Sequence, residues 1–157
     1  MNSVDRRTLI GLLAGAAAAP LLPTRALAAA PASLTMWRDP GCGCCTEWAK
    51  RVETAFGSKM RVINSPDMGA VKRARGVPED LRSCHTAVVN GVVIEGHVPP
   101  ADIKRLLAKR PRGVLGLAVP GMPAGSPGMD VGHNHRQRYQ VFAFSAGGKR
   151  SVFAGHG

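Results

Sequence analysis

Four cysteines are the residues of this chain whose type and spacing allow metal or redox chemistry. Three stand in the run Gly41-Cys42-Gly43-Cys44-Cys45-Thr46, and the fourth is Cys84. Thiolates bind soft metal ions and exchange with disulfides, so the set points to one of these two kinds of chemistry. Because Cys44 and Cys45 are adjacent, two separate structural disulfides on this short turn are an awkward arrangement.

Three interpretations of the cluster follow from the residues. In the first, Cys42 and Cys45 are the Cys-x-x-Cys pair of a thiol–disulfide oxidoreductase, in which Cys42 attacks and Cys45 resolves. In the second, all four thiols are metal ligands: Cys42, Cys44, Cys45 and Cys84. In the third, two disulfides only stabilise the domain. We favour the metal site, because the extra thiols Cys44 and Cys84 invite mixed disulfides in an oxidoreductase.

Copper(I) suits the spacing of the cysteines better than zinc. Zinc sites favour two Cys-x-x-Cys knuckles around a single tetrahedral ion, and the present spacing is crowded for that geometry. Copper(I) prefers thiolate and thioether ligands and tolerates low coordination numbers, which lets closely spaced sulfurs bridge several ions. We therefore expect copper(I) as the bound metal, with room for a polynuclear site.

Five other side chains are weaker candidates as metal ligands: His85, Met122, Met129, His133 and His135. His85 follows Cys84 directly, but neighbours in a strand face opposite sides, so a hydrogen-bonding or surface role is an equal alternative. The two methionines either fill a folded-over loop or line the path by which copper reaches the site. The histidine pair either captures metal or is solvated.

The elements around the cysteines predict an α/β fold of thioredoxin-like order, a central mixed sheet flanked by helices with an extra C-terminal β-hairpin. Strands are expected at 34–39, 60–64, 86–89 and 92–95, helices at 44–56, 65–75 and from Pro99-Pro100 to before Pro111, and the terminal hairpin at 139–144 and 151–154. Asn90-Gly91 is a strong signal for a tight hairpin turn.

This order of elements predicts where the thiols lie. The cysteine run falls at the start of the helix at 44–56, where the helix dipole stabilises thiolate over thiol. Cys84 lies just before the hairpin, and in a thioredoxin-like fold that loop packs against the cysteine loop. We therefore expect all four sulfurs to share one site.

The first 28 residues indicate an export signal. Arg6 and Arg7 precede an apolar run from Leu9 to Leu22, which is typical of the twin-arginine route, and small residues favour cleavage after Ala28. Residues 29–157 are then expected to form one domain, with a Gly/Pro/Met/His-rich loop at 113–136. This predicts a periplasmic protein without a stable membrane span after cleavage.

The chain is strongly basic, with a formal net charge of +11. Loss of the signal removes three arginines and one aspartate, which leaves +9 for the exported protein. A single tyrosine and scattered basic residues argue against a nucleic-acid partner. The charge is expected to be solvated and to attract anionic partners or lipid surfaces weakly.

Several motifs together resemble those of the CopG-type proteins. The resemblance rests on residues 37–45, 83–87 and 95–99, and it extends through 116–123 and 125–129. It implies an exported bacterial protein of copper resistance, whose Cys-x-Cys-Cys motif and fourth cysteine hold a copper cluster on a thioredoxin-like fold. Members are often described only as metal-binding domains of unknown function. Redox interconversion of copper(I) and copper(II) is also implied.

These observations combine into one prediction. We expect a periplasmic copper-binding protein of copper resistance, which holds copper(I) and exchanges it with other periplasmic copper carriers or exporters. A binding role is favoured over a turnover enzyme such as a copper-dependent oxidoreductase.

Overall fold

The computed structural model describes residues 31–130 and 135–157. The predicted export signal at 1–28 lies outside these residues. The elements in chain order are β1 (Leu34–Arg38), α1 (Gly43–Phe56), β2 (Arg61–Asn64), α2 (Met68–Ala74), the short 3₁₀ helix η1 (Glu79–Leu81), β3 (His85–Val89), β4 (Val92–Glu95), α3 (Pro100–Lys109), β5 (Gly116–Ala118), β6 (Tyr139–Phe144) and β7 (Arg150–His156).

The seven strands of the described residues form one mixed sheet in the order β2-β1-β3-β4-β5-β6-β7. The pairs β1/β2 and β4/β5 are parallel, and the other neighbouring strands are antiparallel. The predicted α/β class, the mixed sheet and the C-terminal hairpin are thereby confirmed. The thioredoxin-like character of the fold stays a prediction.

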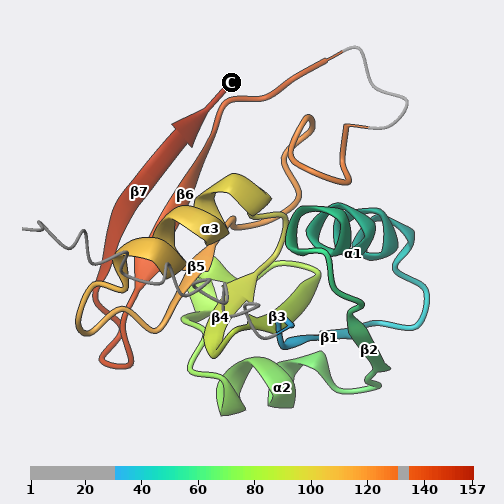
Figure 1. The fold of residues 1–157 in the computed structure, drawn as a ribbon, viewed down its shortest axis with the longest axis horizontal. Helices are drawn as coiled ribbons and strands as arrows, with labels where there is room; N and C mark the ends of the chain where they lie inside the picture. The colour runs from blue at the N-terminus through green and yellow to red at the C-terminus, as the bar shows by residue number, and fades with distance from the viewer. Residues whose placement is uncertain (1–30, 131–134) are drawn as a thin grey trace, which may run out of the picture.

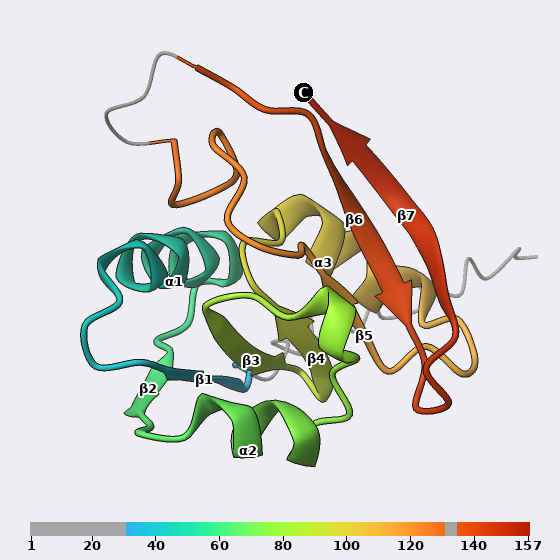
Figure 2. The ribbon, with the colours of Figure 1, turned by 180° about the vertical axis from the view of Figure 1, so that it is seen from behind.

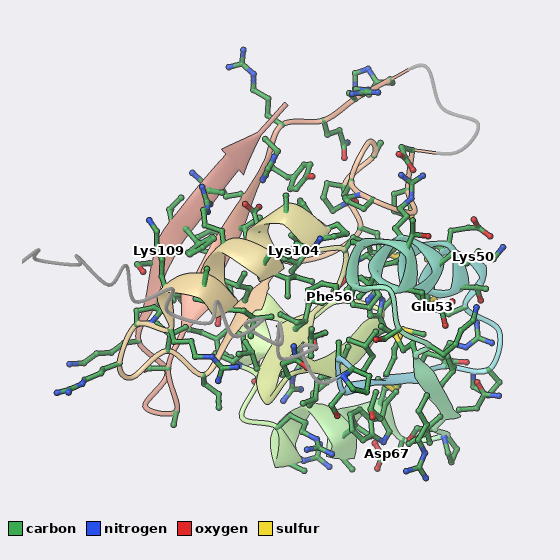
Figure 3. The ribbon with its side chains drawn as sticks, in the orientation of Figure 1. Lys50, Glu53, Phe56, Asp67, Lys104 and Lys109 are labelled. Atoms are coloured by element: carbon green, nitrogen blue, oxygen red, sulfur yellow. A yellow bond between two sulfur atoms is a disulfide. The ribbon has the colours of Figure 1, made fainter. Side chains whose placement is uncertain are left out.

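Helices cover both faces of the sheet. α1 and α3 lie side by side on one face and α2 lies on the other (Figures 1 and 2). Phe56 at the end of α1 points toward Lys104 of α3, whose Nζ is 5.5 Å from the ring centroid (Figure 3). The main core fills the space between these two helices and the sheet, and its fully buried members include Met36, Trp48, Val52, Ile94, Ile103 and Leu117.

α1 has an apolar face that the sequence pattern anticipated. Its buried residues, Cys45, Trp48, Ala49 and Val52, recur at the three- and four-residue spacing of one helix face. The helix ends at Gly57, which has the left-handed conformation that favours glycine as a C-cap. This face anchors α1 on the sheet and so fixes the position of its N-terminal turn.

The β3–β4 hairpin turns at Asn90 and Gly91, as predicted. Both residues have positive φ, 48° and 83°, as a two-residue type I′ turn requires. The turn sets a register in which Thr86 pairs with Glu95. The start of β3, next to Cys84, is therefore held beside the end of β4.

Two local predictions were wrong. α2 begins at Met68 and not at Ser65, because the Asp67 side chain caps it by accepting a hydrogen bond from the Ala70 amide at 2.8 Å (Figure 3). The segment 113–136, expected as a loop, contains the strand β5. β5 adds to β4 and carries the hairpin β6–β7, so a long-range pairing overrides the local composition. Within the described residues, no helix combines the length and apolar character that crossing a membrane requires.

The central strand β4 offers a test of this core. Ile94 is fully buried, so Ile94→Ala is expected to lower the free energy of unfolding by about 2–5 kcal/mol through lost burial and a cavity. Val62→Ala on the edge strand β2 is the control, since Val62 is 45% exposed, and we expect a change within about 0.5 kcal/mol. Urea denaturation measures both, and equal effects of the two substitutions would contradict the assignment of the core.

Candidate metal centre

The structure brings the four predicted cysteines together. Cys42 and Cys45 form a disulfide, while Cys44 and Cys84 are free thiols. The Cys44 sulfur is 3.5 Å from that of Cys42, and the Cys84 sulfur is 3.6 Å from that of Cys45. All four sulfur atoms lie within 4.8 Å of one another. Each end of the disulfide therefore has a free thiol beside it.

The cysteine run is placed by the β1–α1 connection. Cys42 is the N-cap of α1, and its amide donates to the Asp39 carbonyl at 3.1 Å. Arg38 at the end of β1 donates from one guanidinium nitrogen to the Cys42 carbonyl at 2.7 Å and to the Thr46 hydroxyl at 2.6 Å. The guanidinium and the positive end of the helix dipole both favour negative charge on nearby sulfur.

Cys84 reaches the cluster from the segment between η1 and β3. Its neighbour on one side, Ser83, donates a short hydroxyl hydrogen bond to the Gly121 carbonyl. Its neighbour on the other side, His85, accepts a hydrogen bond from the Gly96 amide at 3.0 Å. The backbone is thus held on both sides of Cys84.

His97 is a site residue that the sequence did not single out. Its Nε2 is 3.1 Å from the Cys84 sulfur, and its Nδ1 is 2.8 Å from the Pro127 carbonyl. A carbonyl only accepts, so Nδ1 carries the hydrogen and neutral His97 directs the lone pair of Nε2 at the sulfur. Burial lowers the pKa of His97 and favours this neutral form, although the bond to Pro127 acts in the opposite direction. The signals in the sequence were the position of His97 just after β4 and its place in the motif at 95–99.

His85 is fully buried, so a surface role for it is wrong. Its ring lies 4.4 Å from the Trp48 ring and 5.1 Å from the His97 ring, centroid to centroid. Its Nδ1 is 3.3 Å from the Cys84 sulfur, and Nε2 has no hydrogen-bond partner among the described residues. Burial, followed by the charges of His97 and Lys72, holds its pKa well below the usual range. Cys84, His85 and His97 therefore form a second group with metal-ligand spacing.

The thiol of Cys84 is held in its neutral form in the absence of metal. Burial, and next the charge of a Cys44 thiolate, raise its pKa to about 12. A thiolate at Cys84 is therefore unfavourable without a cation beside it. A cation bound at the sulfur would replace the proton and reverse the preference.

The loop after β5 folds over the start of α1. A Cβ atom at Gly128 would lie 2.8 Å from the Trp48 amide nitrogen and 2.9 Å from the Cys44 carbonyl, so the close approach requires glycine. Asp130 forms an ion pair with Arg51 of α1 at 2.7 Å. The loop thereby brings the Pro127 carbonyl to His97 and covers one side of the cluster.

The remaining candidate ligands differ in exposure. Met122 is 52% exposed and Met129 is half-buried, both in the loop that folds over α1. His135 is exposed, and His133 lies outside the described residues. The hydrogen-bond contacts of the cluster sulfurs in the described part of the chain are with cysteine, histidine and Ser83.

The raised pKa of Cys84 predicts an unusual pH profile of alkylation. In the folded, disulfide-containing protein its reaction with iodoacetamide is expected to keep accelerating between pH 9 and 10, because the thiolate fraction still rises there. The same thiol in the urea-unfolded chain should level off near pH 9. Peptide mapping after an acid quench measures both rates. A folded-state rate that levels off near pH 9 would contradict the environment described for Cys84.

Comparison with known proteins adds a family match and two similar solved structures. A protein family described as "Protein of unknown function, DUF411" matches residues 81–129. The solved structure "Copper resistance protein copG- Form 2" is 42% identical, covers 81% of this chain and 99% of its own, and superposes with a TM-score of 0.74. Form 1 of the same protein gives 43% identity, coverages of 80% and 98%, and a TM-score of 0.73. A comparison with curated proteins gives no match.

Proposed function

Since this chain belongs to the family of the copper resistance protein copG, we propose that it binds copper(I) on Cys42, Cys44, Cys45 and Cys84. The single observation that carries the proposal is the convergence of the four sulfurs within 4.8 Å. Thiolates are the ligands that copper(I) prefers, and low coordination numbers suit sulfurs this close together. Resistance would follow from withholding free copper(I) from other thiols.

The reduced protein is the form that binds in this proposal. The Cys42–Cys45 disulfide leaves only Cys44 and Cys84 as thiols. Reduction of the disulfide by two electrons adds two further sulfur ligands. His97 Nε2, 3.1 Å from the Cys84 sulfur, adds one nitrogen to the donor set. His85 Nδ1 lies 3.3 Å from the same sulfur.

Charge balance favours several copper ions in the site. One copper(I) ion on four thiolates would leave a large negative charge in a place where burial already raises the pKa of Cys84. One copper(I) ion for each thiolate would neutralise the cluster. The sulfur separations of 3.5 and 3.6 Å also let sulfurs bridge neighbouring ions.

Oxidation of Cys42 and Cys45 to their disulfide can supply the two electrons that reduce two copper(II) ions. Two copper(II) ions take one electron each from the thiols of Cys42 and Cys45, which yields two copper(I) ions, the disulfide and two protons. The two copper(I) ions then remain beside Cys44, Cys84 and His97. Reduction of the disulfide by an external thiol resets the site.

The compartment and partners are proposed from the sequence. An export signal at 1–28 places the mature protein in the periplasm, where copper carriers or exporters would deliver or receive the ions. Met122, Met129, His133 and His135 would assist transfer along the loop as weaker ligands. The cysteines would then bind copper tightly, and these loop residues would bind it more weakly.

An anaerobic titration of the reduced protein with copper(I), against a competing chelator, tests the proposal. We expect more than one tightly held ion per chain, and Cys84→Ser should weaken binding by at least about tenfold, since it removes a bridging ligand. Val152→Ala is the control, because Val152 on β7 is 54% exposed and has no role in the proposed site, and tight binding should change by less than about twofold.

Two results would reject the copper proposal. One is fewer than one tightly held ion per chain. The other is unchanged affinity after Cys84→Ser. Titration of the protein with its disulfide intact gives an internal comparison, and weaker binding is expected there because Cys42 and Cys45 are unavailable.

A thiol–disulfide oxidoreductase is the second candidate function. The Cys42–Cys45 disulfide at the start of α1 favours it, because this is the place of a redox-active pair. The test is oxidation or reduction of a model disulfide substrate in the presence of a strong copper chelator. Turnover that Cys42→Ser abolishes would rank this function above copper binding.

A further inference from the structure

A buried carboxylate lies at the end of β4, on the side of the sheet that α2 covers. Glu95 at the end of β4 is fully buried, and each of its oxygens accepts hydrogen bonds. Oε1 accepts from the Ser83 amide at 2.6 Å, and Oε2 accepts from the Thr86 hydroxyl at 2.6 Å. The copper proposal assigns no role to this residue.

Lys72 of α2 balances this carboxylate. Its ammonium is 2.5 Å from Glu95 Oε1 and 3.2 Å from the Thr86 hydroxyl, and its side chain is 7% exposed. Burying an ion pair opposes folding unless hydrogen bonds satisfy both charges. Here the lysine, the glutamate and the threonine satisfy one another, and the Ser83 amide takes the remaining place on Oε1.

The bond to Ser83 connects this network to the cluster. Ser83 precedes Cys84, so the carboxylate fixes the backbone from which the Cys84 sulfur reaches Cys45 at 3.6 Å. The end of β4 is also packed closely against Ser83, since a Cβ atom at Gly96 would lie 2.5 Å from the Ser83 Cβ. Small movements of the glutamate are therefore transmitted to Ser83.

We propose that Glu95 and Lys72 are positioning residues for the copper site, which hold the Cys84 sulfur beside Cys45 by fixing the Ser83 amide. The consequence for copper rests on the proposed function, but the placement of the sulfur does not. Two elements, α2 and β4, would then set the geometry of a site to which neither contributes a copper ligand.

The placement is measured without copper in a Cys42→Ser/Cys44→Ser background. Only Cys45 and Cys84 remain, and equilibrium with glutathione reports how readily their sulfurs meet. In this background Lys72→Met/Glu95→Leu removes the ion pair together with the acceptor for Ser83. Lys72→Met/Glu95→Gln removes the charges but keeps an amide oxygen for Ser83.

We expect the leucine variant to lower the Cys45–Cys84 disulfide equilibrium constant by about tenfold or more, since the Ser83 amide loses its anchor. The glutamine variant should recover it to within about threefold of the background. This rescue separates positioning from general loss of packing. An unchanged constant in the leucine variant, or equal losses in both variants, would overturn the proposal.

A second, more exposed ion pair that also accepts a backbone amide provides a control. Glu53 of α1 also pairs with a lysine, Lys59, at 3.1 Å, and also accepts a backbone amide, that of Met60, at 2.8 Å. It lies on α1, on the other face of the sheet from α2 (Figure 3). Lys59→Met/Glu53→Leu should leave the disulfide constant within about twofold, and an equal loss in this control would also overturn the proposal.

A milder variant covers the case in which the leucine variant does not fold. Thr86→Val removes the hydrogen bond to Glu95 Oε2 and keeps the ion pair. We expect the disulfide constant to fall by about threefold, with the circular dichroism spectrum unchanged. No change in a folded Thr86→Val protein would then count against positioning by Glu95.

Copper binding gives a second readout in the protein with all four cysteines. If Glu95 acts through Cys84, Cys84→Ser should weaken copper(I) binding much less in the Lys72→Met/Glu95→Leu background than in the parent. Additive effects would contradict this link. Failure of the parent to bind copper would reject the proposed function alone, because the glutathione measurement still decides the placement of Cys84.

Discussion

The approach of Cys84 to the start of α1 is the contact on which the site depends. Cys45 and Cys84 are 39 residues apart, yet their sulfurs lie 3.6 Å from each other. Cys42, Cys44 and Cys45 lie on one short turn at the start of α1. The sulfur of Cys84 reaches them only if β3 pairs in register with both β1 and β4. The mixed sheet is thus the part of the fold that turns a Cys-x-x-Cys pair into a four-sulfur site.

Burial and charge give this contact its chemistry. The Cys84 thiol has a pKa raised to about 12, and neutral histidines line the side away from solvent. Arg38 and the N-terminus of α1 provide positive potential on the other side of the cluster. In the proposed site, thiolates would be stabilised by this positive potential, while copper(I) would replace the thiol protons and accept the imidazole lone pair. Cys42 and Cys45 form a disulfide when oxidised, so oxidation would compete with the proposed metal binding for these two sulfurs.

Local patterns predicted the parts of the fold that depend on neighbouring residues. The helical pattern at 44–56 predicted α1, and Asn90-Gly91 predicted the hairpin, because both signals act within a few residues. β5 was missed because a three-residue strand exists only through its neighbours. His97 was missed because its contacts with Cys84 and Pro127 join segments that are adjacent only in the folded chain. Arg38 was missed because its bonds to Cys42 and Thr46 depend on how the β1–α1 connection turns, which no residue pattern indicated. The Lys72–Glu95 pair is of the same kind, since nothing near either residue indicates burial.

The central claim is that four sulfurs share one copper site. Copper K-edge X-ray absorption of the reduced, copper(I)-loaded protein tests it most directly, since it reports the atoms that surround the metal. The account predicts a first shell dominated by sulfur, with copper–copper scattering from bridged ions and less sulfur after Cys84→Ser. A first shell dominated by nitrogen or oxygen, unchanged by that substitution, would contradict it.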